Sequence, residues 1–386
     1  MRLLLVDNVH LYKDESGNYF APSIYNYEFI KRYLNVFEEV SLIAKVKDIK
    51  SSEAGAYSKV NGRGVTVIEL PFYQGLKEML SVLNKLIRIY RASCRNCDCA
   101  ILRLAQIEGF FTFIFGNLKN IPYAVEMVND PNTFVDMPCY MRIFSVFMSK
   151  LIIRRASGVS YVTEKYLQRI YKPSKGAFTT YYSSVELNES DIEKEPVVYS
   201  PDSTFRIVHV SNAINSDIKG HYTLIKAFGL IIEEGVDAEL VIIGDGNKAV
   251  EYKRYVERTG LQDKVKFLGK LQRDELMSTL KTCNLMVLPT KMEGLPRTII
   301  EAMSVGLPCL SSPTAGVPEL IDEEYLFGTD DARGFADKIE YLVKKTDELM
   351  KMSMDNLKVS SKYTKSHLQK KRKWFYTKLR EAVISR

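Results

Sequence analysis

Short apolar runs alternate with amphipathic stretches along the whole chain, and a polar connector, Glu195–Thr204, divides them into two series. The runs have the length of buried strands, and the stretches between them repeat apolar residues at helical spacing. Buried strands that alternate with helices are typical of parallel sheets covered by helices. We therefore predict an α/β chain with two doubly wound domains. Ligands of such domains bind beyond the carboxyl ends of the strands, so the loops after the strands are the place to search.

The apolar runs are the predicted strands. In the first series they are Leu3–Val6, Val40–Ala44, Val65–Glu69, Ala100–Leu104, Tyr123–Val128 and Gly158–Val162. In the second series they are Ile207–Ser211, Leu240–Ile243, Val265–Leu268, Leu285–Leu288 and Pro308–Ser311. The predicted helices are Ile24–Leu34, Leu76–Tyr90, His221–Glu233, Lys248–Arg258, Arg273–Lys281 and Arg297–Val305. A further segment, Met141–Arg155, has apolar residues at positions 144, 147, 148, 151 and 152, which predicts a helix packed on the core. Its basic end permits contact with a membrane interface.

The composition excludes several classes of protein. With 46% hydrophobic and 26% charged residues, the 386-residue chain has an ordinary globular profile, so it is not disordered or of low complexity. Its longest aromatic-apolar stretch, Gly109–Phe115, is far shorter than the roughly 20 residues that span a bilayer. The first residues, Met1–Asp7, lack the long apolar region and the cleavage site of a signal peptide. We expect a cytoplasmic protein.

The net charge of +7 is unevenly placed. Residues 356–386 hold ten Lys and Arg against Glu381 alone, and residues 77–95 hold five against Glu78. These stretches either form solvated helix faces or contact an anionic surface such as phospholipid headgroups. No nucleic-acid-binding motif accompanies the charge, so we expect no nucleic-acid partner.

Three of the six cysteines, Cys94, Cys97 and Cys99, lie close together in the sequence. A closed zinc site needs a fourth thiolate or imidazole, and no pair among the four histidines has ligand spacing. Cys99 also opens an apolar run that is predicted as a strand. Reduced cytoplasmic thiols are therefore favoured over a metal site.

The segment Pro289–Pro308 carries the most specific pattern in the sequence. The predicted strand Leu285–Leu288 leads into a loop with Glu293, and Pro296 suits the first turn of the helix that follows. The free N–H groups and the positive dipole end of that helix form an anion site at the edge of the sheet. Glu293 precedes this site and Glu301 follows it. Two carboxylates repel phosphate but accept strong hydrogen bonds from hydroxyls, so the pattern favours a nucleotide sugar, whose phosphates lie between two polyols.

This segment resembles the signature of retaining glycosyltransferases of family 4, which have the GT-B fold. The resemblance rests on Glu293-x7-Glu301 followed by Ala302-Met303-x-x-Gly306-x-Pro308. Further blocks match in order: Lys219-Gly220, Ile242-Ile-Gly244-Asp-Gly246, Val265-Lys-Phe-Leu-Gly269, Asp274-Glu275-Leu276 and Ala315-Gly-Val-Pro-Glu319. It is strong from about residue 205 to residue 321 and diffuse in the first half. It implies an acceptor-binding Rossmann-like domain at 1–198, a nucleotide-sugar-binding domain at 204–360 and a C-terminal helix, 361–386, that returns to the first domain.

The resemblance also implies roles for individual residues. Glu301 would bind the ribose hydroxyls, Glu293 would face the donor sugar, and Lys219 would neutralise the diphosphate leaving group. The start of the helix would meet sugar oxygens and phosphate through Gly294, Leu295, Pro296 and Arg297.

Three glycines have a second explanation beside the one that the resemblance implies. Gly244 and Gly246 would let the nucleotide approach the backbone closely, and Gly17 would touch the donor phosphate. Ordinary turns account for the same three glycines. The pattern Gly244-x-Gly246-x-x-Ala249 also mimics a dinucleotide fingerprint, but it does not follow the first strand of its series and lacks the acid at the end of the next strand, so we do not expect an oxidoreductase.

The sequence departs from the family's pattern in two places. Ala213 stands where the family carries a second cation for the diphosphate, so Arg297 or a residue of the first domain would have to replace it. The first domain also lacks the family's histidine after its fifth-strand region, where Asn129 and Asp130 stand instead. Either residue could orient the acceptor or the sugar, and Asp130 is the candidate for a part in the chemistry. A front-face retaining mechanism needs no base, because the leaving phosphate oxygen can take the acceptor's proton.

The resemblance implies a retaining transferase that moves a sugar from a nucleotide diphosphate sugar to an acceptor. The basic, aromatic-rich composition suits a lipid-linked saccharide in surface-polysaccharide synthesis, with the enzyme peripheral on an anionic membrane at the cytoplasmic face of the plasma membrane. No Asp-x-Asp follows a strand, so we expect activity without a metal or another cofactor. Two alternatives stay open: a sugar-nucleotide epimerase, and a non-catalytic GT-B scaffold that binds a membrane or a partner.

Overall fold

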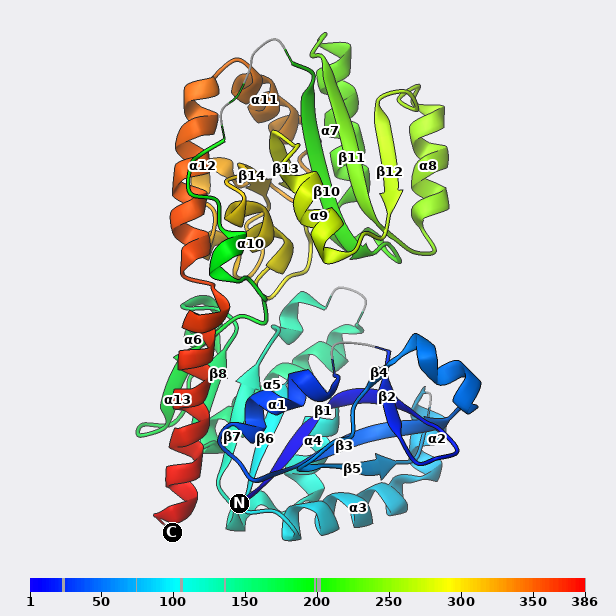
Figure 1. The fold of residues 1–386 in the computed structure, drawn as a ribbon, viewed down its shortest axis with the longest axis vertical. Coiled ribbons are helices and arrows are strands. Elements are labelled where there is room, and N and C mark those ends of the chain that lie inside the picture. The colour runs from blue at the N-terminus through cyan, green and yellow to red at the C-terminus, as the bar shows by residue number, and fades with distance from the viewer. Residues whose placement is uncertain are drawn as a thin grey trace.

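The computed structural model describes residues 1–22, 25–73, 75–104, 107–134, 137–197, 199 and 203–385. The chain forms two α/β domains stacked end to end, and a long C-terminal helix runs from the second domain back along the first (Figure 1). No helix in the described ranges combines the length and the apolarity needed to cross a bilayer.

The first domain is built on a nine-stranded sheet. Its parallel strands run in the order β5-β3-β1-β6-β7-β8-β9. They are β1 (Arg2–Lys13), β3 (Glu39–Asp48), β5 (Val65–Leu70), β6 (Cys99–Leu104), β7 (Tyr123–Met127), β8 (Gly158–Tyr161) and β9 (Phe178–Tyr181). The six predicted strands all lie within this set, so the apolar runs located the centre of the sheet.

Sequence analysis missed the margins of this sheet. The strand predicted at Leu3–Val6 continues to Lys13 after a shift of register between Val6 and His10. Its far end pairs antiparallel with β2 (Tyr19–Ala21), which pairs with β4 (Ser58–Lys59). These short strands and the half-exposed edge strand β9 carry no apolar run of four or more residues, and such a run is the signal that identified the others.

Helices cover both faces of the first sheet. On one face α3 (Leu83–Arg95) contacts α4 (Ile107–Phe115), and α4 contacts α5 (Cys139–Arg155). On the other face α1 (Tyr27–Leu34) meets the C-terminal helix through the rings of Tyr33 and Tyr376, 4.8 Å apart. In Figure 1 α1 and the C-terminal helix lie in front of the sheet, and α4 and α5 lie behind it. The helix predicted at Leu76–Tyr90 is divided into α2 (Gly75–Ser81) and α3.

The second domain has a five-stranded parallel sheet in the order β12-β11-β10-β13-β14. Its strands are β10 (Phe205–Ala213), β11 (Ala238–Asp245), β12 (Val265–Gly269), β13 (Leu285–Leu288) and β14 (Cys309–Ser311). Its helices are α7 (His221–Glu233), α8 (Ala249–Arg258), α9 (Arg273–Leu280), α10 (Arg297–Ser304), α11 (Ala332–Val343) and α12 (Thr346–Ser361). Every strand and helix predicted here is present. The connector predicted at Glu195–Thr204 lies partly outside the described residues.

The C-terminal helix, α13 (Lys365–Ile384), returns to the first domain as expected and contacts β6, β8 and β9. Phe375, Tyr376 and Leu379 are buried in that contact. The ring of Phe178 lies 6.3 Å from that of Trp374. The apolar edge of this helix therefore binds the first domain.

The expectation that α5 is a core helix is only half right. Met148 and Ile152 are buried, but Phe144 and Phe147 are 52% and 62% exposed. Helical spacing identifies a shared face, and it does not decide whether another element covers that face.

The cysteine cluster lies in the core. Cys94, Cys97 and Cys99 are free and buried. Burial raises the pKa of Cys94 and of Cys97 to about 12, which favours the neutral thiol. Within the described ranges, no three His, Cys, Asp or Glu residues are arranged to hold a metal ion.

Candidate functional site

The loop between β13 and α10 lies where the two domains meet. Leu295 is buried, and Pro296 precedes Arg297, the first helical residue, instead of lying in the first turn. A Cβ on Gly294 would lie 2.7 Å from the carbonyl oxygen of Val128 in the first domain. It would also lie 2.9 Å from Oδ1 of Asn129, the residue next to Val128. Glycine is therefore required here by the contact with the loop after β7.

Lys219 and Glu293 form an ion pair in this loop region. The lysine ends the short helix Asp217–Lys219 after β10, and its Nζ also donates to the carbonyl oxygen of Met292 at 3.4 Å. Gly220 adopts φ +71°, and a Cβ there would lie 2.0 Å from the carbonyl oxygen of Pro289. The close packing of these two loops brings together the predicted diphosphate cation and the predicted sugar carboxylate.

Glu301 lies on the second turn of α10 and lines a pocket of about 1000 Å³ at the junction of the domains. Burial raises the pKa of Glu301 above its ordinary value, although the positive charges of Arg297 and Arg273 oppose this. The Arg273 guanidinium lies 3.7 Å from its Oε1. A half-buried carboxylate beside two guanidinium groups can accept hydrogen bonds from a polar ligand.

This pocket is strongly basic, and most of its positively charged side chains lie on α1 and α13. Its Lys and Arg residues are Lys31, Arg32, Arg273, Arg297, Lys365, Lys370, Arg372 and Lys373. Ala213, at the position of the missing cation, pairs with Asp245 and does not line it. The structure thus supplies cations near Glu301 from Arg297 and from α1 and α13 of the first domain's side. Sequence analysis offered Arg297 or an unnamed residue of the first domain, and the others were not identifiable because they reach the pocket through long-range packing.

Gly244 and Gly246 are explained by packing within the protein. A Cβ on Gly244 would lie 1.7 Å from the carbonyl oxygen of Ser211. A Cβ on Gly246 would lie 2.5 Å from Oδ1 of Asn215. Both glycines allow the end of β11 and the loop after it to pack on the end of β10 and the loop after it, which favours the turn explanation over contact with a nucleotide.

The carboxylate of Asp130 is enclosed by the protein and is not positioned to act as a base. It is fully buried, and its carboxylate accepts hydrogen bonds from the hydroxyls of Tyr166 at 2.8 Å and Tyr171 at 2.6 Å. It also accepts from the backbone N–H of Asn132 at 2.9 Å. A carboxylate enclosed in this way fixes the loop after β7, so the prediction that Asp130 takes part in the chemistry is not supported by its surroundings. Asn129, beside Gly294, is the half-buried member of the pair.

The structure does not bring Gly17 to the other predicted residues. It lies in the turn between β1 and β2, with φ +79° and open space around the position of a Cβ. Its N–H donates to the carbonyl oxygen of Asp14 at 3.0 Å. It does not line the pocket beside Glu301.

A second contact joins the domains on the first domain's side of the cleft. The carboxylate of Glu319 accepts hydrogen bonds from three consecutive backbone N–H groups, those of Glu164 at 2.6 Å, Lys165 at 2.9 Å and Tyr166 at 2.6 Å. The sequence contained Glu319 in a motif, but the partners lie more than 150 residues away.

Comparisons with known proteins fit this architecture. Residues 191–358 match the family described as glycosyl transferases group 1. Protein CapJ of Staphylococcus aureus is 28% identical over 345 residues, which cover 86% of this chain and 83% of CapJ. N-acetyl-alpha-D-glucosaminyl L-malate synthase of Bacillus anthracis is 32% identical over 167 residues, 42% of each chain.

Solved structures show the same fold at low sequence identity. Sucrose-phosphate synthase of Thermosynechococcus elongatus has a TM-score of 0.70 over 99% of this chain and 100% of that chain, at 17% identity. HepE of Anabaena, solved in complex with UDP and glucose, has a TM-score of 0.65 over the whole of both chains, at 15% identity. The fold is GT-B.

Proposed function

We propose that this chain, whose residues 191–358 match the glycosyl transferases of group 1, transfers a sugar from a nucleotide diphosphate sugar to a lipid-linked saccharide with retention at the anomeric carbon. The product would be a cell-surface polysaccharide or its precursor. The name of a relative supports a role in polysaccharide synthesis. WcaL of Escherichia coli, which is 29% identical over 162 residues, is described as a putative colanic acid biosynthesis glycosyltransferase.

The observation that carries the proposal is the Lys219–Glu293 pair, in the loops at the start of α10. The free N–H groups of a helix start favour a phosphate, and the Lys219 ammonium adds a positive charge where the diphosphate departs. Glu293 would then face the donor sugar, and Glu301 would accept hydrogen bonds from the ribose hydroxyls. HepE, which has this fold, was solved with UDP-glucose, so a nucleotide sugar suits the architecture.

Retention follows from attack on the face that the diphosphate leaves. The acceptor oxygen bonds to the anomeric carbon while the bond from that carbon to the phosphate oxygen breaks. The departing phosphate oxygen takes the acceptor's proton, so no protein base is needed. The enclosed position of Asp130 agrees with this proposal.

The test uses the purified full chain and a panel of nucleotide diphosphate sugars. We expect slow hydrolysis of one donor without acceptor, and an α-linked product from an α-linked donor when a lipid-linked saccharide is added, as read by NMR of the anomeric proton. Conversion of the donor sugar into its epimer would establish the epimerase instead. Absence of binding to every donor by calorimetry would establish the non-catalytic scaffold.

A further inference from the structure

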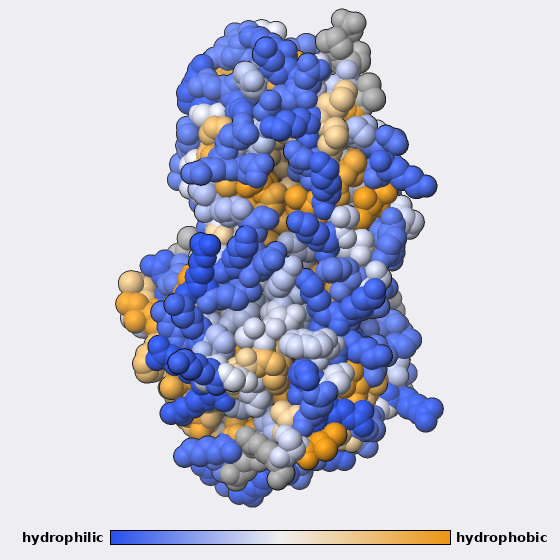
Figure 2. Space-filling view, turned by 90° about the vertical axis from the view of Figure 1, so that its left-hand side faces the viewer, coloured by the Kyte–Doolittle hydropathy of each residue, from blue (hydrophilic) through white to orange (hydrophobic). Residues whose placement is uncertain are grey.

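One face of the first domain carries an apolar stripe that no described element covers. On α5 the side chains of Tyr140, Ile143, Phe144 and Phe147 are each more than half exposed, and their spacing places them on one side of the helix. In Figure 2, hydrophobic side chains project from the left-hand edge of the lower domain, the side that lies behind the sheet in Figure 1. Ile114 of α4 is 49% exposed, so the apolar surface extends to the neighbouring helix.

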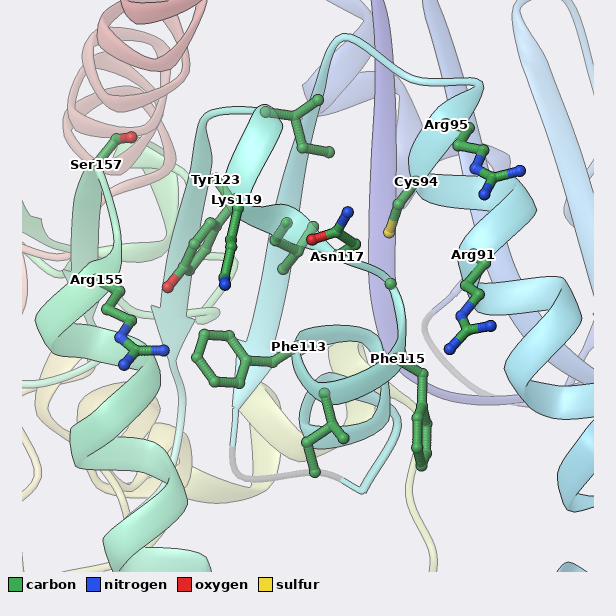
Figure 3. Close-up of a pocket in the computed structure, with 14 residues that line it drawn as sticks. Arg91, Cys94, Arg95, Phe113, Phe115, Asn117, Lys119, Tyr123, Arg155 and Ser157 are labelled. Carbon is green, nitrogen blue, oxygen red and sulfur yellow. The ribbon is translucent and has the colours of Figure 1, made fainter.

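A basic pocket lies at the end of the same helical layer, and Figure 3 shows its lining. It has a volume of about 870 Å³. Arg91 and Arg95 enter from α3, Lys119 comes from the loop after α4, and Arg155 comes from the last turn of α5. The Arg155 guanidinium lies 5.7 Å from the centre of the Phe113 ring. Among the residues that the structure describes, none of these four cations forms an ion pair with an acidic group.

Other cations on this layer are also without ion pairs in the described part of the chain. They are Lys85 and Arg88 on α3, and Arg142, Lys150 and Arg154 on α5. The C-terminal stretch differs, because several of its cations are engaged with other groups of the protein. Arg372 is buried and donates to the carbonyl oxygen of Ser183, Lys371 lies 3.3 Å from the centre of the Tyr181 ring, and Arg380 pairs with Glu38 at 2.9 Å.

We propose that the face formed by α3, α4 and α5 docks on an anionic phospholipid bilayer. The apolar stripe of α5 would enter the interface between headgroups and acyl chains, and the basic pocket would hold lipid phosphate groups. Aromatic and aliphatic side chains beside unpaired Lys and Arg are the composition that such an interface binds. A second copy of this chain fits poorly, because a two-fold contact through this face would set the same unpaired cations against each other.

The docked orientation would bring the acceptor to the site, and here the inference rests on the proposed function, which supplies the lipid-linked acceptor. Residues 131–133, at the loop after β7, contact α5, and Asn129 of that loop touches Gly294. The apolar end of the α5 stripe therefore lies toward the junction of the domains, and its basic end lies away from it. A bilayer against this face would bring a lipid-linked saccharide to the mouth of the site.

The test is co-sedimentation of the full chain with vesicles of phosphatidylcholine alone or with 30% phosphatidylglycerol, at low and high salt. We expect binding only to the anionic vesicles and release by salt. The variant Arg95→Gln/Lys119→Gln/Arg155→Gln should lower the vesicle partition coefficient by on the order of 100-fold, at about fivefold for each cation. The variant Ile143→Ser/Phe147→Ser should also lose binding. Its matched control, Val250→Ser/Met354→Ser, changes exposed apolar residues of the second domain and should bind as the parent chain does.

The charge control is Lys226→Gln/Lys345→Gln/Lys351→Gln, which removes three exposed cations of the second domain and should bind nearly as well as the parent chain. An equal loss of vesicle binding in both triple variants would contradict the proposed docking face. The proposal would also fail if the α5 variant converted a dimer to a monomer and still bound vesicles as the parent chain does. Circular dichroism establishes that each variant is folded, and the three-cation variant tests the proposal even if the α5 variant does not fold. The assay contains neither donor nor acceptor, so its result is independent of whether the transfer reaction occurs.

Discussion

The hydroxyl of Tyr376 donates a hydrogen bond of 2.9 Å to Oε1 of Glu126, which joins the last helix of the chain to the centre of the first sheet. The same carboxylate accepts from Tyr182 at 2.8 Å and from Tyr33 at 3.1 Å, and it lies 3.0 Å from the Arg103 guanidinium. All five groups are buried. Three of these partners belong to the first domain, and the docked α13 supplies the fourth.

Replacing Tyr376 with Phe should therefore destabilise the first domain. A hydrogen bond to a charged group contributes about 1.5–3 kcal/mol, and Glu126 would keep its other partners, so we expect a loss toward the lower end of that range in urea unfolding. Tyr140→Phe, at an exposed tyrosine, is the matched control and should leave the free energy of unfolding within about 0.5 kcal/mol of the parent value. No difference between the two variants would mean that the docked helix does not depend on this bond.

The two carboxylates of the site should have separable effects. Glu301→Ala should weaken binding of the free nucleoside diphosphate by about 1.5–3 kcal/mol, because charge-assisted hydrogen bonds to the ribose are lost. Glu293→Ala should leave that affinity nearly unchanged, since Lys219 stays available to the diphosphate, and should lower turnover. Calorimetry and donor hydrolysis measure the two effects. Glu233→Ala, on the exposed side of α7, is the control, and equal nucleotide affinity in Glu301→Ala and the control would contradict the ribose assignment.

Transfer should proceed without a divalent cation. Lys219 and the start of α10 offer positive charge to the leaving diphosphate, and Arg297 lines the adjoining pocket. We expect the same rate of donor hydrolysis with EDTA, with magnesium and with manganese. Activity that stops in EDTA and returns with either metal would show that these cations do not suffice.

Glu319 should hold the two domains in the closed arrangement. Its carboxylate caps three backbone N–H groups of the first domain, so Glu319→Ala should favour more open conformations. We expect a larger radius of gyration in small-angle scattering and a lower kcat/KM for transfer. Glu323→Ala, an exposed neighbour, should change neither quantity. An unchanged scattering profile for Glu319→Ala would show that the remaining contacts hold the domains together.

Two buried histidines should make the second domain sensitive to acid. Burial lowers the pKa of His209 to about 4 and that of His221 to about 2, against 6.5 as the ordinary value. Both rings are neutral in the folded state, so the unfolded state binds more protons below pH 6.5 and stability falls as the pH drops. The expected loss is roughly 2 kcal/mol for each ring between pH 7 and pH 5.

His221→Phe separates this effect from general acid unfolding. Neither ring nitrogen of His221 has a hydrogen-bond partner within the described ranges, and the ring stacks on Tyr252 with centroids 4.6 Å apart. Phe should fit that stack, keep the stability at pH 7 and reduce the slope of stability against pH. Urea unfolding at pH 7 and pH 5 gives both values. An unchanged slope in this variant would contradict the assignment.

The sequence by itself determined the elements and the local pattern of the site. Apolar runs located the strands of the second sheet, because a buried parallel strand is apolar at almost every position. Glu293 and Glu301 lie on one loop and the helix that follows it, so their spacing already placed both beside the helix start. Only the tertiary structure decided which partners these groups have. Lys219 reaches Glu293 across 74 residues, and Arg273 reaches Glu301 by the packing of α9 on α10.

The tertiary structure also decided which surfaces are covered. The sequence predicts a solvated basic face or an anionic contact for residues 356–386 and a core helix at Met141–Arg155, yet Arg372 is buried while Phe147 is exposed. The sequence makes Asp130 a candidate for a part in the chemistry, yet the hydroxyls of Tyr166 and Tyr171 enclose its carboxylate. The spacing of apolar residues in the sequence indicates which side chains share a face. Whether that face meets protein, ligand or membrane depends on elements that arrive from distant parts of the chain, and their arrival is set by packing of the whole fold.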